Sequence, residues 1–270
     1  MDRATLADVA TELAVSAGTL ALDMQNGVSR VREKGLKDVV TEADEACERM
    51  ITESIMRLFP DHSTVTEESP SRRTGSDITW YIDPIDGTVN YSRGIPVWGV
   101  SVGVAWRGRM EVGAIRLPAL DETYTAVRGE GAFLNGNPIN VSATPSLDDV
   151  VMASGDFNVG ADEEQQNSIN RLNLVMFGRV APRIKRIKCF GAAVAESAMV
   201  ASGRIEAYLM NSYHPWDVAA ASLLVTEAGG KASRLDGAPF ELDGSAALFS
   251  NGTIHEDLLK VLTSDSAKHH

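Results

Sequence analysis

The 270-residue sequence contains two cysteines, no long apolar run and far fewer basic than acidic residues. Cys47 and Cys189 are too few for a disulfide framework, and we expect both to be reduced thiols. The longest apolar stretch, near residues 96–106, is much shorter than the about 20 residues that span a membrane. Residues 1–3 lead into an amphipathic pattern without a signal-peptide core. These absences predict a cytoplasmic protein without a membrane partner.

The charge of the chain is strongly one-sided. There are 37 acidic and 25 basic residues, so the formal net charge is −12. Because such a surface repels polyanions, we expect neither nucleic acid nor an anionic membrane as a partner. Hydrophobic residues make up 44% of the chain, which is enough for a substantial core in one large domain or in two halves.

The spacing of apolar residues predicts both helices and strands. Helices are expected over 3–25, 42–58, 162–177, 190–202, 217–228 and 254–262. Strands are expected within 61–66 and 80–83, and over 97–106, 110–117, 122–128, 150–154, 205–210 and 247–249. A composition shift at 142–149 divides the chain into an N-terminal half, 1–145, with a mostly antiparallel sheet, and a C-terminal half, 146–262. Residues 263–270 form a tail that includes a possible tag remnant.

One stretch, Trp80-Tyr81-Ile82-Asp83-Pro84-Ile85-Asp86-Gly87-Thr88, begins as a buried strand and then breaks. Pro84 has no N–H to donate, so it is expected to end the strand ladder. Asp83 and Asp86 then lie close together across a tight turn, where two carboxylates repel each other unless a proton or a cation intervenes. A strand-ending turn with solvated carboxylates explains the same residues without any ligand.

The remaining groups of this stretch favour a ligand. The Ile85 carbonyl is free to bind a hard cation, and Gly87 lets the backbone approach a ligand closely. Thr88 offers both an N–H and a hydroxyl. Together with the carboxylates, these groups predict a site for a metal ion and a phosphate.

Other acidic residues are ambiguous when taken singly. Glu67 and Glu68 are adjacent, as in many solvated loops, and Asp44 supplies first-turn negative charge after a predicted N-cap. Asp217 lies near the start of its helix, where N-capping explains it fully; alternatively it supplies another metal carboxylate. Lys34, in a glycine-containing loop, is either solvated or able to reach a bound metal or phosphate.

In combination, these segments resemble the signatures of the inositol monophosphatase family. The strongest matches are Glu67-Glu68-Ser69, the stretch from Trp80 to Asn90, and Trp216-Asp217-Val218-Ala219-Ala220-Ala221. Residues 38–44, 129–136 and 227–230 also resemble family segments, and the resemblance extends from the first helix to about residue 262. It implies an α/β (α+β) alternating α/β/α/β/α sandwich, of the type shared with fructose-1,6-bisphosphatase, usually as a homodimer.

The resemblance also implies Mg²⁺-dependent, lithium-sensitive hydrolysis of phosphomonoesters, with two or three ions in each active site. The implied ligands of the first ion are Glu67, Asp83 and the Ile85 carbonyl. The implied ligands of the second are Asp83, Asp86 and Asp217. Glu67 would also help a third ion, with Glu68 and Lys34 as accessory candidates.

The resemblance assigns catalysis and binding as well. Thr88 and Asp44, with Glu67 as a further catalytic residue, would orient and deprotonate the attacking water. The N–H groups of Gly87 and Thr88 would hold the phosphate, and Asp86 is a further phosphate or substrate ligand. The substrate wall would be Gly191-Ala192-Ala193.

Elementary chemistry agrees with a metal requirement. Hydrolysis of a dianionic phosphate monoester is extremely slow without catalysis, and divalent cations neutralise its charge. Mg²⁺ prefers oxygen ligands, which suits six acidic residues: Asp44, Glu67, Glu68, Asp83, Asp86 and Asp217. An acidic protein can therefore attract phosphate once it is loaded with metal.

The substrate is expected to be a small phosphorylated polyol or metabolite, with inositol-1-phosphate first. Met210 stands where inositol-hydrolysing members commonly have a glutamate, and methionine is a poor acceptor for hydroxyl groups. Thr66 replaces the usual glycine before the two glutamates. Histidinol phosphate, fructose-1,6-bisphosphate and 3′-phosphoadenosine nucleotides are alternatives, and a non-catalytic regulatory binding protein is the alternative of a different class. The three basic residues Lys185, Arg186 and Lys188 would serve a more anionic substrate or simply be solvated.

Overall fold

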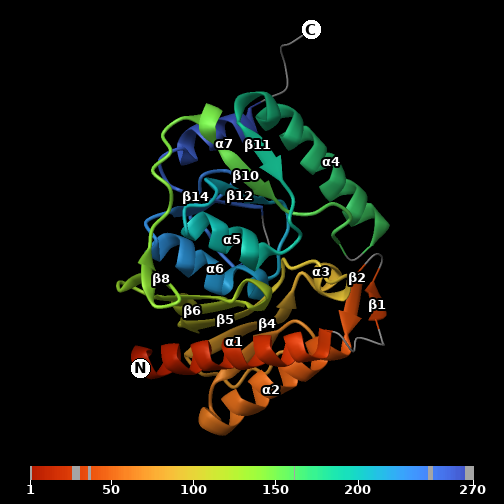
Figure 1. Cartoon of the computed structure of the whole chain (residues 1–270), viewed down its shortest axis with the longest axis vertical. Helices are drawn as coiled ribbons and strands as arrows, with labels where there is room; N and C mark the ends of the chain where they lie inside the picture. The colour runs from red at the N-terminus through yellow and green to blue at the C-terminus, as the bar shows by residue number, and fades with distance from the viewer. Residues whose placement is uncertain (1, 26–30, 36–37, 161, 243–245, 265–270) are drawn as a thin grey trace.

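The computed structural model describes residues 2–25, 31–35, 38–160, 162–242 and 246–264, with only the backbone at 31–35, 38 and 39. Five layers alternate between helices and sheets (Figure 1). The helices are α1 (Arg3–Gln25), α2 (Glu42–Leu58), α3 (Thr88–Ser92), α4 (Glu163–Val180), α5 (Ala193–Ala201), α6 (Pro215–Glu227) and α7 (His255–Thr263). This confirms the expected α/β/α/β/α sandwich.

Seven strands form the larger sheet, in the order β3-β4-β5-β6-β7-β8-β9. They are β3 (Ser63–Thr66), β4 (Ile78–Asp86), β5 (Gly99–Trp106), β6 (Arg109–Leu117), β7 (Glu122–Val127), β8 (Gly131–Leu134) and β9 (Asn137–Ile139). All neighbours in this sheet are antiparallel except β3 and β4, which run parallel. The N-terminal sheet is therefore mostly antiparallel, as its short turns predict.

Five strands form the second sheet, in the order β11-β10-β12-β14-β13. They are β10 (Val151–Ser154), β11 (Arg186–Lys188), β12 (Ala207–Met210), β13 (Lys231–Arg234) and β14 (Ala247–Ser250). Because β10 is parallel to both β11 and β12, the C-terminal ends of these three strands meet at one edge. Ligands commonly bind outside the C-terminal ends of parallel strands, so the loops that leave this edge are of functional interest.

Three hydrophobic clusters fill the spaces between the layers. The first joins α1 and α2 to one face of the large sheet, through residues such as Ala17, Ile51 and Trp80. The second joins the other face of that sheet to α5, α6 and the second sheet, and it includes Tyr124 and Val218. The third lies between the second sheet and the outermost helices α4 and α7. α5 and α6 thus lie at the centre of the molecule.

Four local predictions need correction. The β4 ladder does not end at Pro84: pairing with β5 is irregular between Asp83 and Asp86 and resumes at Asp86, opposite Gly99. This irregularity takes residue 84 out of the ladder, where its missing N–H costs no hydrogen bond. A short helix, α3, and three strands, β8, β9 and β13, were not predicted. Lys34 lies in a two-stranded hairpin, β1 (Val31–Gly35) with β2 (Asp38–Thr41), instead of a loop.

By length and composition, α1 is the one helix of the described chain that could cross a membrane. One face of α1 is buried against α2 and the large sheet, including Leu6, Ala10 and Ala14. A helix that packs in this way is a core helix of the sandwich.

Candidate active site

Two carboxylates, Asp83 and Asp86, flank the irregularity in β4. Asp83 is 1% exposed, and its Oδ1 atom is buried without a hydrogen-bond partner in the described structure. Burial raises the pKa of Asp83 well above its usual value, and the negative charges of Glu67, Asp86 and Asp217 raise it further. A hydrogen bond between the Glu67 and Asp83 carboxyls acts in the same direction. Four acidic residues from distant parts of the chain therefore meet here.

Asp86 links the strand break to α5. Its Oδ2 atom accepts a hydrogen bond from the Val194 N–H at 2.8 Å. Burial raises the pKa of Asp86 to about 7, although the N–H groups of Val194 and Ala193 act in the opposite direction. The charges of Glu67 and Asp156 contribute to the increase. Asp86 thus lies between the metal-site candidates and the predicted substrate wall.

Glu67 and Glu68 follow the C-terminal end of β3, and Glu48 of α2 holds their loop. The Glu68 N–H donates to Glu48 Oε2 at 2.7 Å. Glu48 is 1% exposed, and its Oε1 atom has no hydrogen-bond partner in the described structure. Sequence reasoning missed this residue because a glutamate inside an amphipathic helix is normally solvated.

Asp44 and Thr88 lie together, as predicted. The Thr88 hydroxyl is 3.2 Å from Asp44 Oδ1 and 3.0 Å from the Ile85 carbonyl. Its single hydrogen is shared between these two acceptors. Asp44 Oδ2 also accepts from the Thr41 N–H at 2.9 Å, in the capping box that begins α2. Burial raises the pKa of Asp44 to about 6, against the lowering effect of Thr41. Asp44 is therefore close to the range in which a carboxylate accepts a proton at neutral pH.

Gly87 lies close to the predicted substrate wall. Its φ of 85° is left-handed, and it is the N-cap of α3. A Cβ atom at this position would lie 3.0 Å from the Ala192 side chain and 3.1 Å from the Gly191 carbonyl. Only glycine allows both the backbone conformation and this approach.

Asn90 of α3 connects the strand break to the predicted substrate wall by hydrogen bonds. Its Nδ2 atom donates to the Val97 carbonyl at 2.7 Å and to the Phe190 carbonyl at 2.6 Å. The predicted wall residues Gly191, Ala192 and Ala193 therefore lie beside Gly87 and Asp86. No local pattern identifies Asn90, since one of its partners is 100 residues away.

Asp217 is the third residue of α6, which begins at Pro215. The helix starts two residues earlier than predicted, so the N-cap is His214 and Asp217 is the N3 residue of a capping box. The Asp217 Oδ2 atom accepts from the His214 N–H at 2.7 Å, so Asp217 caps the start of α6 from this position. Because its charge also acts on Asp83, Asp217 belongs to the acidic cluster.

Three other predicted features have different outcomes. Met210 is buried at the end of β12 and offers no strong acceptor. The side chain of Lys34 lies outside the described part of the structure, so its accessory role stays a prediction. The basic pair Arg186 and Lys188 is exposed on β11.

The acidic cluster has the donor chemistry of a site for a hard divalent cation. Among the described residues, no three His, Cys, Asp or Glu side chains are already arranged as a metal-ligating group. Mg²⁺ does not require such an arrangement, because it keeps several water ligands and is commonly held by one or two carboxylates. The unpaired, buried Oδ1 of Asp83 fits this requirement, since such an atom needs either a proton or a cation.

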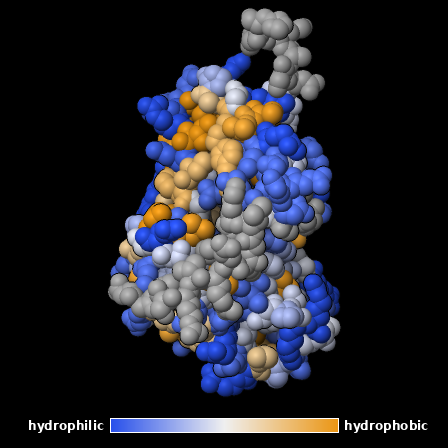
Figure 2. All heavy atoms as spheres, turned by 90° about the vertical axis from the view of Figure 1, so that its right-hand side faces the viewer, coloured by the Kyte–Doolittle hydropathy of each residue, from blue (hydrophilic) through white to orange (hydrophobic). Residues whose placement is uncertain are grey.

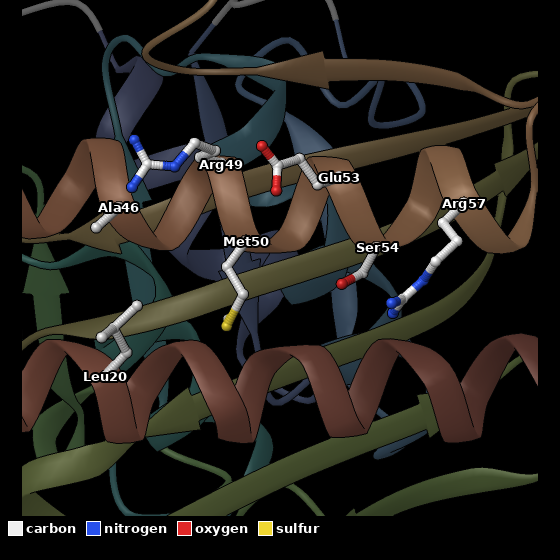
Figure 3. A pocket seen from close by; sticks show the side chains of 7 residues that line it. All are labelled: Leu20, Ala46, Arg49, Met50, Glu53, Ser54 and Arg57. Atoms are coloured by element: carbon white, nitrogen blue, oxygen red, sulfur yellow. The ribbon is translucent and has the colours of Figure 1, made fainter.

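A hollow away from this cluster lies between α1 and α2. It has a volume of about 460 Å³, and Figure 3 shows Met50 directed towards α1 while Arg49 and Glu53 point away from it. An adjoining groove of about 380 Å³ reaches Glu68 and Ser69. Side chains of both charges alternate along the two hollows, which is typical of a solvated groove between surface helices.

Known proteins share this fold. A model of the inositol monophosphatase family matches residues 2–267. The fructose-1,6-bisphosphatase/inositol-1-monophosphatase of Thermotoga maritima is 34% identical over 256 residues, which are 94% of each chain. Nus factor SuhB of Salmonella typhimurium is 37% identical over 206 residues, covering 76% of this chain and 75% of SuhB. The structure of inositol monophosphatase from Anabaena (Nostoc) superimposes with a TM-score of 0.86 and 33% identity, over 97% of this chain and 96% of that one.

These similarities define the class of protein: it is a phosphoric monoester hydrolase. The chain belongs to the inositol monophosphatase family. The fold expected from the sequence motifs is therefore the fold of the family.

Proposed function

We propose that the protein is a Mg²⁺-dependent phosphomonoesterase that hydrolyses a small phosphorylated polyol. The observation that carries this proposal is the buried Oδ1 of Asp83, which has no hydrogen-bond partner in the described structure and lies among the charges of Glu67, Asp86 and Asp217. A cluster of this kind is stable only if protons or cations offset the repulsion. The Mg²⁺ dependence of the family supports a cation.

The residues divide into two proposed ligand sets. Glu67, Asp83 and the Ile85 carbonyl would hold one ion, and Asp83, Asp86 and Asp217 a second. A third ion would use Glu67, with Glu68 and Lys34 as accessory residues. When bound, Mg²⁺ would neutralise phosphate charge and make the attacking water more acidic.

Thr88 and Asp44 are the proposed catalytic pair, with Glu67 beside them. The Thr88 hydroxyl contacts Asp44 Oδ1, so it can donate to Asp44 while it accepts a hydrogen bond from water. A proton released by water can pass through Thr88 to Asp44, whose pKa of about 6 leaves it largely ionised at neutral pH. The capping hydrogen bond from the Thr41 N–H fixes the Asp44 carboxylate in this orientation.

The phosphate and the leaving group have separate proposed places. The N–H groups of Gly87 and Thr88, at the start of α3, would bind phosphate oxygens beside Asp86. The leaving group would lie against Gly191, Ala192 and Ala193, the first two of which lie about 3 Å from the position that a Cβ atom on Gly87 would occupy. Inositol-1-phosphate is the first proposed substrate, and histidinol phosphate, fructose-1,6-bisphosphate and 3′-phosphoadenosine nucleotides are the alternatives.

Phosphate release from a panel of these esters, with and without Mg²⁺, tests the proposal. We expect Asp83→Asn and Asp217→Asn to lower kcat at least 100-fold at saturating Mg²⁺ and to weaken Mn²⁺ binding measured by calorimetry. Asp77→Asn, which changes an exposed carboxylate paired with Arg107, is the matched control. Turnover near that of the unchanged protein in both site variants would contradict the metal assignment. Inhibition by millimolar Li⁺ is a further expected result.

A second copy of the chain is the proposed partner. Leu174 and Val175 on α4 are 63% and 45% exposed. Figure 2 shows apolar surface gathered in the upper part of the face on which α4 lies. Exposed apolar area of this kind favours association, and we propose a cytoplasmic homodimer. Light scattering should give twice the chain mass, and Leu174→Glu should give the mass of one chain.

A regulatory binding role is the second candidate, and the similarity to Nus factor SuhB is the observation that favours it. Under this alternative the protein would bind Mg²⁺ but release phosphate from no ester in the panel. Turnover of any ester, lost in Asp83→Asn, would support the enzymatic proposal instead.

A further inference from the structure

Asp156 has no role in the chemistry described above, yet it lies against the substrate wall. Its Oδ2 atom is 2.8 Å from the position that a Cβ atom on Gly191 would occupy. The Gly191 carbonyl is in turn 3.1 Å from the equivalent position on Gly87, at the proposed phosphate site. Gly191 therefore lies between the Asp156 carboxylate and the proposed phosphate site.

The backbone of Asp156 is fixed by its neighbours. It leaves the C-terminal end of β10, and the preceding N–H, of Gly155, donates to the Leu209 carbonyl at 2.8 Å. Its own carbonyl accepts from the buried Asn173 amide at 3.1 Å. Asn211, which follows Met210, donates to Asn173. The side chain of Asp156 is thus presented by a rigid scaffold, as substrate-binding groups require.

The carboxylate of Asp156 is available to a ligand. The residue is exposed, and among the described residues no hydrogen bond or ion pair occupies its side chain. It adds to the negative charges of Asp86 and Glu196. In contrast, Met210 lies at the end of the adjacent parallel strand and cannot accept a strong hydrogen bond.

We propose that Asp156 determines substrate specificity by accepting a hydrogen bond from the leaving group. This assignment rests on the proposed phosphomonoesterase function and deepens it. The favoured esters have a leaving group with a hydrogen-bond donor, either a hydroxyl of a polyol or the ammonium of an amino alcohol. The same negative charge disfavours a leaving group that carries a second phosphate, as in fructose-1,6-bisphosphate.

Specificity is measured as a ratio of kcat/KM values at saturating Mg²⁺: the value for an ester whose leaving group has a hydrogen-bond donor, divided by the value for an ester whose leaving group has none. The donor-bearing ester is whichever of inositol-1-phosphate, glycerol 2-phosphate and histidinol phosphate the unchanged protein hydrolyses best. The other is p-nitrophenyl phosphate, whose leaving group has no donor. In Asp156→Ala, the ratio of kcat/KM values should fall about 10- to 100-fold, mainly through KM, because one hydrogen bond to a charged acceptor is lost. Asp156→Asn keeps one acceptor oxygen and should reduce the ratio less.

Control variants distinguish a change in substrate specificity from a general loss of activity. Asp148→Ala makes the same charge change before the other end of β10 and should leave the ratio within twofold. In Asp156→Asn, hydrolysis of fructose-1,6-bisphosphate should rise relative to the donor-bearing ester. Comparing histidinol phosphate with the two polyol esters identifies whether the donor is an ammonium or a hydroxyl.

Two outcomes overturn the assignment. One is an unchanged ratio in a folded Asp156→Ala protein, with folding checked by thermal unfolding. The other is hydrolysis of p-nitrophenyl phosphate alone by the unchanged protein. If the unchanged protein hydrolyses no ester, the proposed function fails, which is a different and distinguishable result.

Discussion

The amide of Asn90 donates a hydrogen bond to the Phe190 carbonyl at 2.6 Å, across 100 residues of sequence. The same nitrogen donates to the Val97 carbonyl at 2.7 Å. Both donors of this amide are used, so α3 and the loop before α5 are held in one fixed arrangement. The proposed phosphate site and the proposed substrate wall are on the two sides of this connection.

Replacing Asn90 should therefore affect both stability and catalysis. In Asn90→Ala, two partly buried carbonyls lose their donor, which should reduce the free energy of unfolding by about 1–3 kcal/mol. We expect kcat/KM to fall at least 10-fold, because the wall is no longer aligned with the phosphate site. Chemical denaturation and steady-state kinetics measure the two effects. Asn137→Ala, which removes an exposed amide in β9, should change neither, and wild-type kinetics in Asn90→Ala would contradict the positioning role.

Much of the scaffold follows from local sequence. α1 spans the 23 residues from Arg3 to Gln25 that its apolar spacing predicts, and Thr41 with Asp44 forms the predicted start of α2. What local patterns did not show are the contacts between distant segments. Asn90, in a short helix, and Asp156, in a loop, are ordinary residues until the second sheet is packed against α5. The prediction that Pro84 ends the strand ladder was wrong for a related reason. Whether a proline interrupts a ladder depends on how the partner strand pairs around it.

The two glycines that flank α3 provide a matched test of the close contact at Gly87. Gly87 and Gly94 both have positive φ, but only a Cβ on Gly87 would meet the substrate wall, whereas nothing lies within 4 Å of one on Gly94. Gly94→Ala should cost about 1 kcal/mol of stability through backbone strain alone. Gly87→Ala adds a steric clash with Gly191 and Ala192, so kcat/KM should fall at least 100-fold while the Gly94 variant stays within about threefold. Equal kinetic effects in the two variants would contradict the contact.

Glu48 should influence metal affinity without binding metal. Its carboxylate holds the Glu68 N–H and thereby positions Glu67, so Glu48→Ala should raise the Mn²⁺ dissociation constant about 10-fold. Glu48→Gln keeps an acceptor of the same shape and should have a smaller effect. Calorimetry with Mn²⁺ measures binding directly, and Glu53→Ala, on the exposed face of the same helix, is the control. An affinity in Glu48→Ala equal to that of the control would show that the Glu67 loop needs no support from α2.

His255 should make the fold sensitive to acid independently of the active site. The ring is fully buried at the start of α7, with its two nitrogens 2.7 Å from the Ser250 hydroxyl and 2.8 Å from the Ser233 hydroxyl. Burial lowers the pKa of His255 to about 4, and Lys231 lowers it further while Glu256 opposes the effect. An unfolded histidine titrates near pH 6.5, so below that pH the unfolded chain binds a proton that the native protein does not.

The contribution of neutral His255 to stability is therefore complete above about pH 6.5 and is lost as the pH falls towards 4. Between pH 7 and pH 5 the loss should be about 2 kcal/mol, from a maximum slope of about 1.4 kcal/mol per pH unit. Urea denaturation at both pH values measures it, and His255→Asn should lose this part of the pH dependence although it is less stable at pH 7. The same pH dependence in both proteins would mean that other groups cause the acid sensitivity. Measuring Mn²⁺ binding at pH 7 in His255→Asn separates this effect from the carboxylate cluster, because His255 is in a different layer of the sandwich and should leave the affinity unchanged.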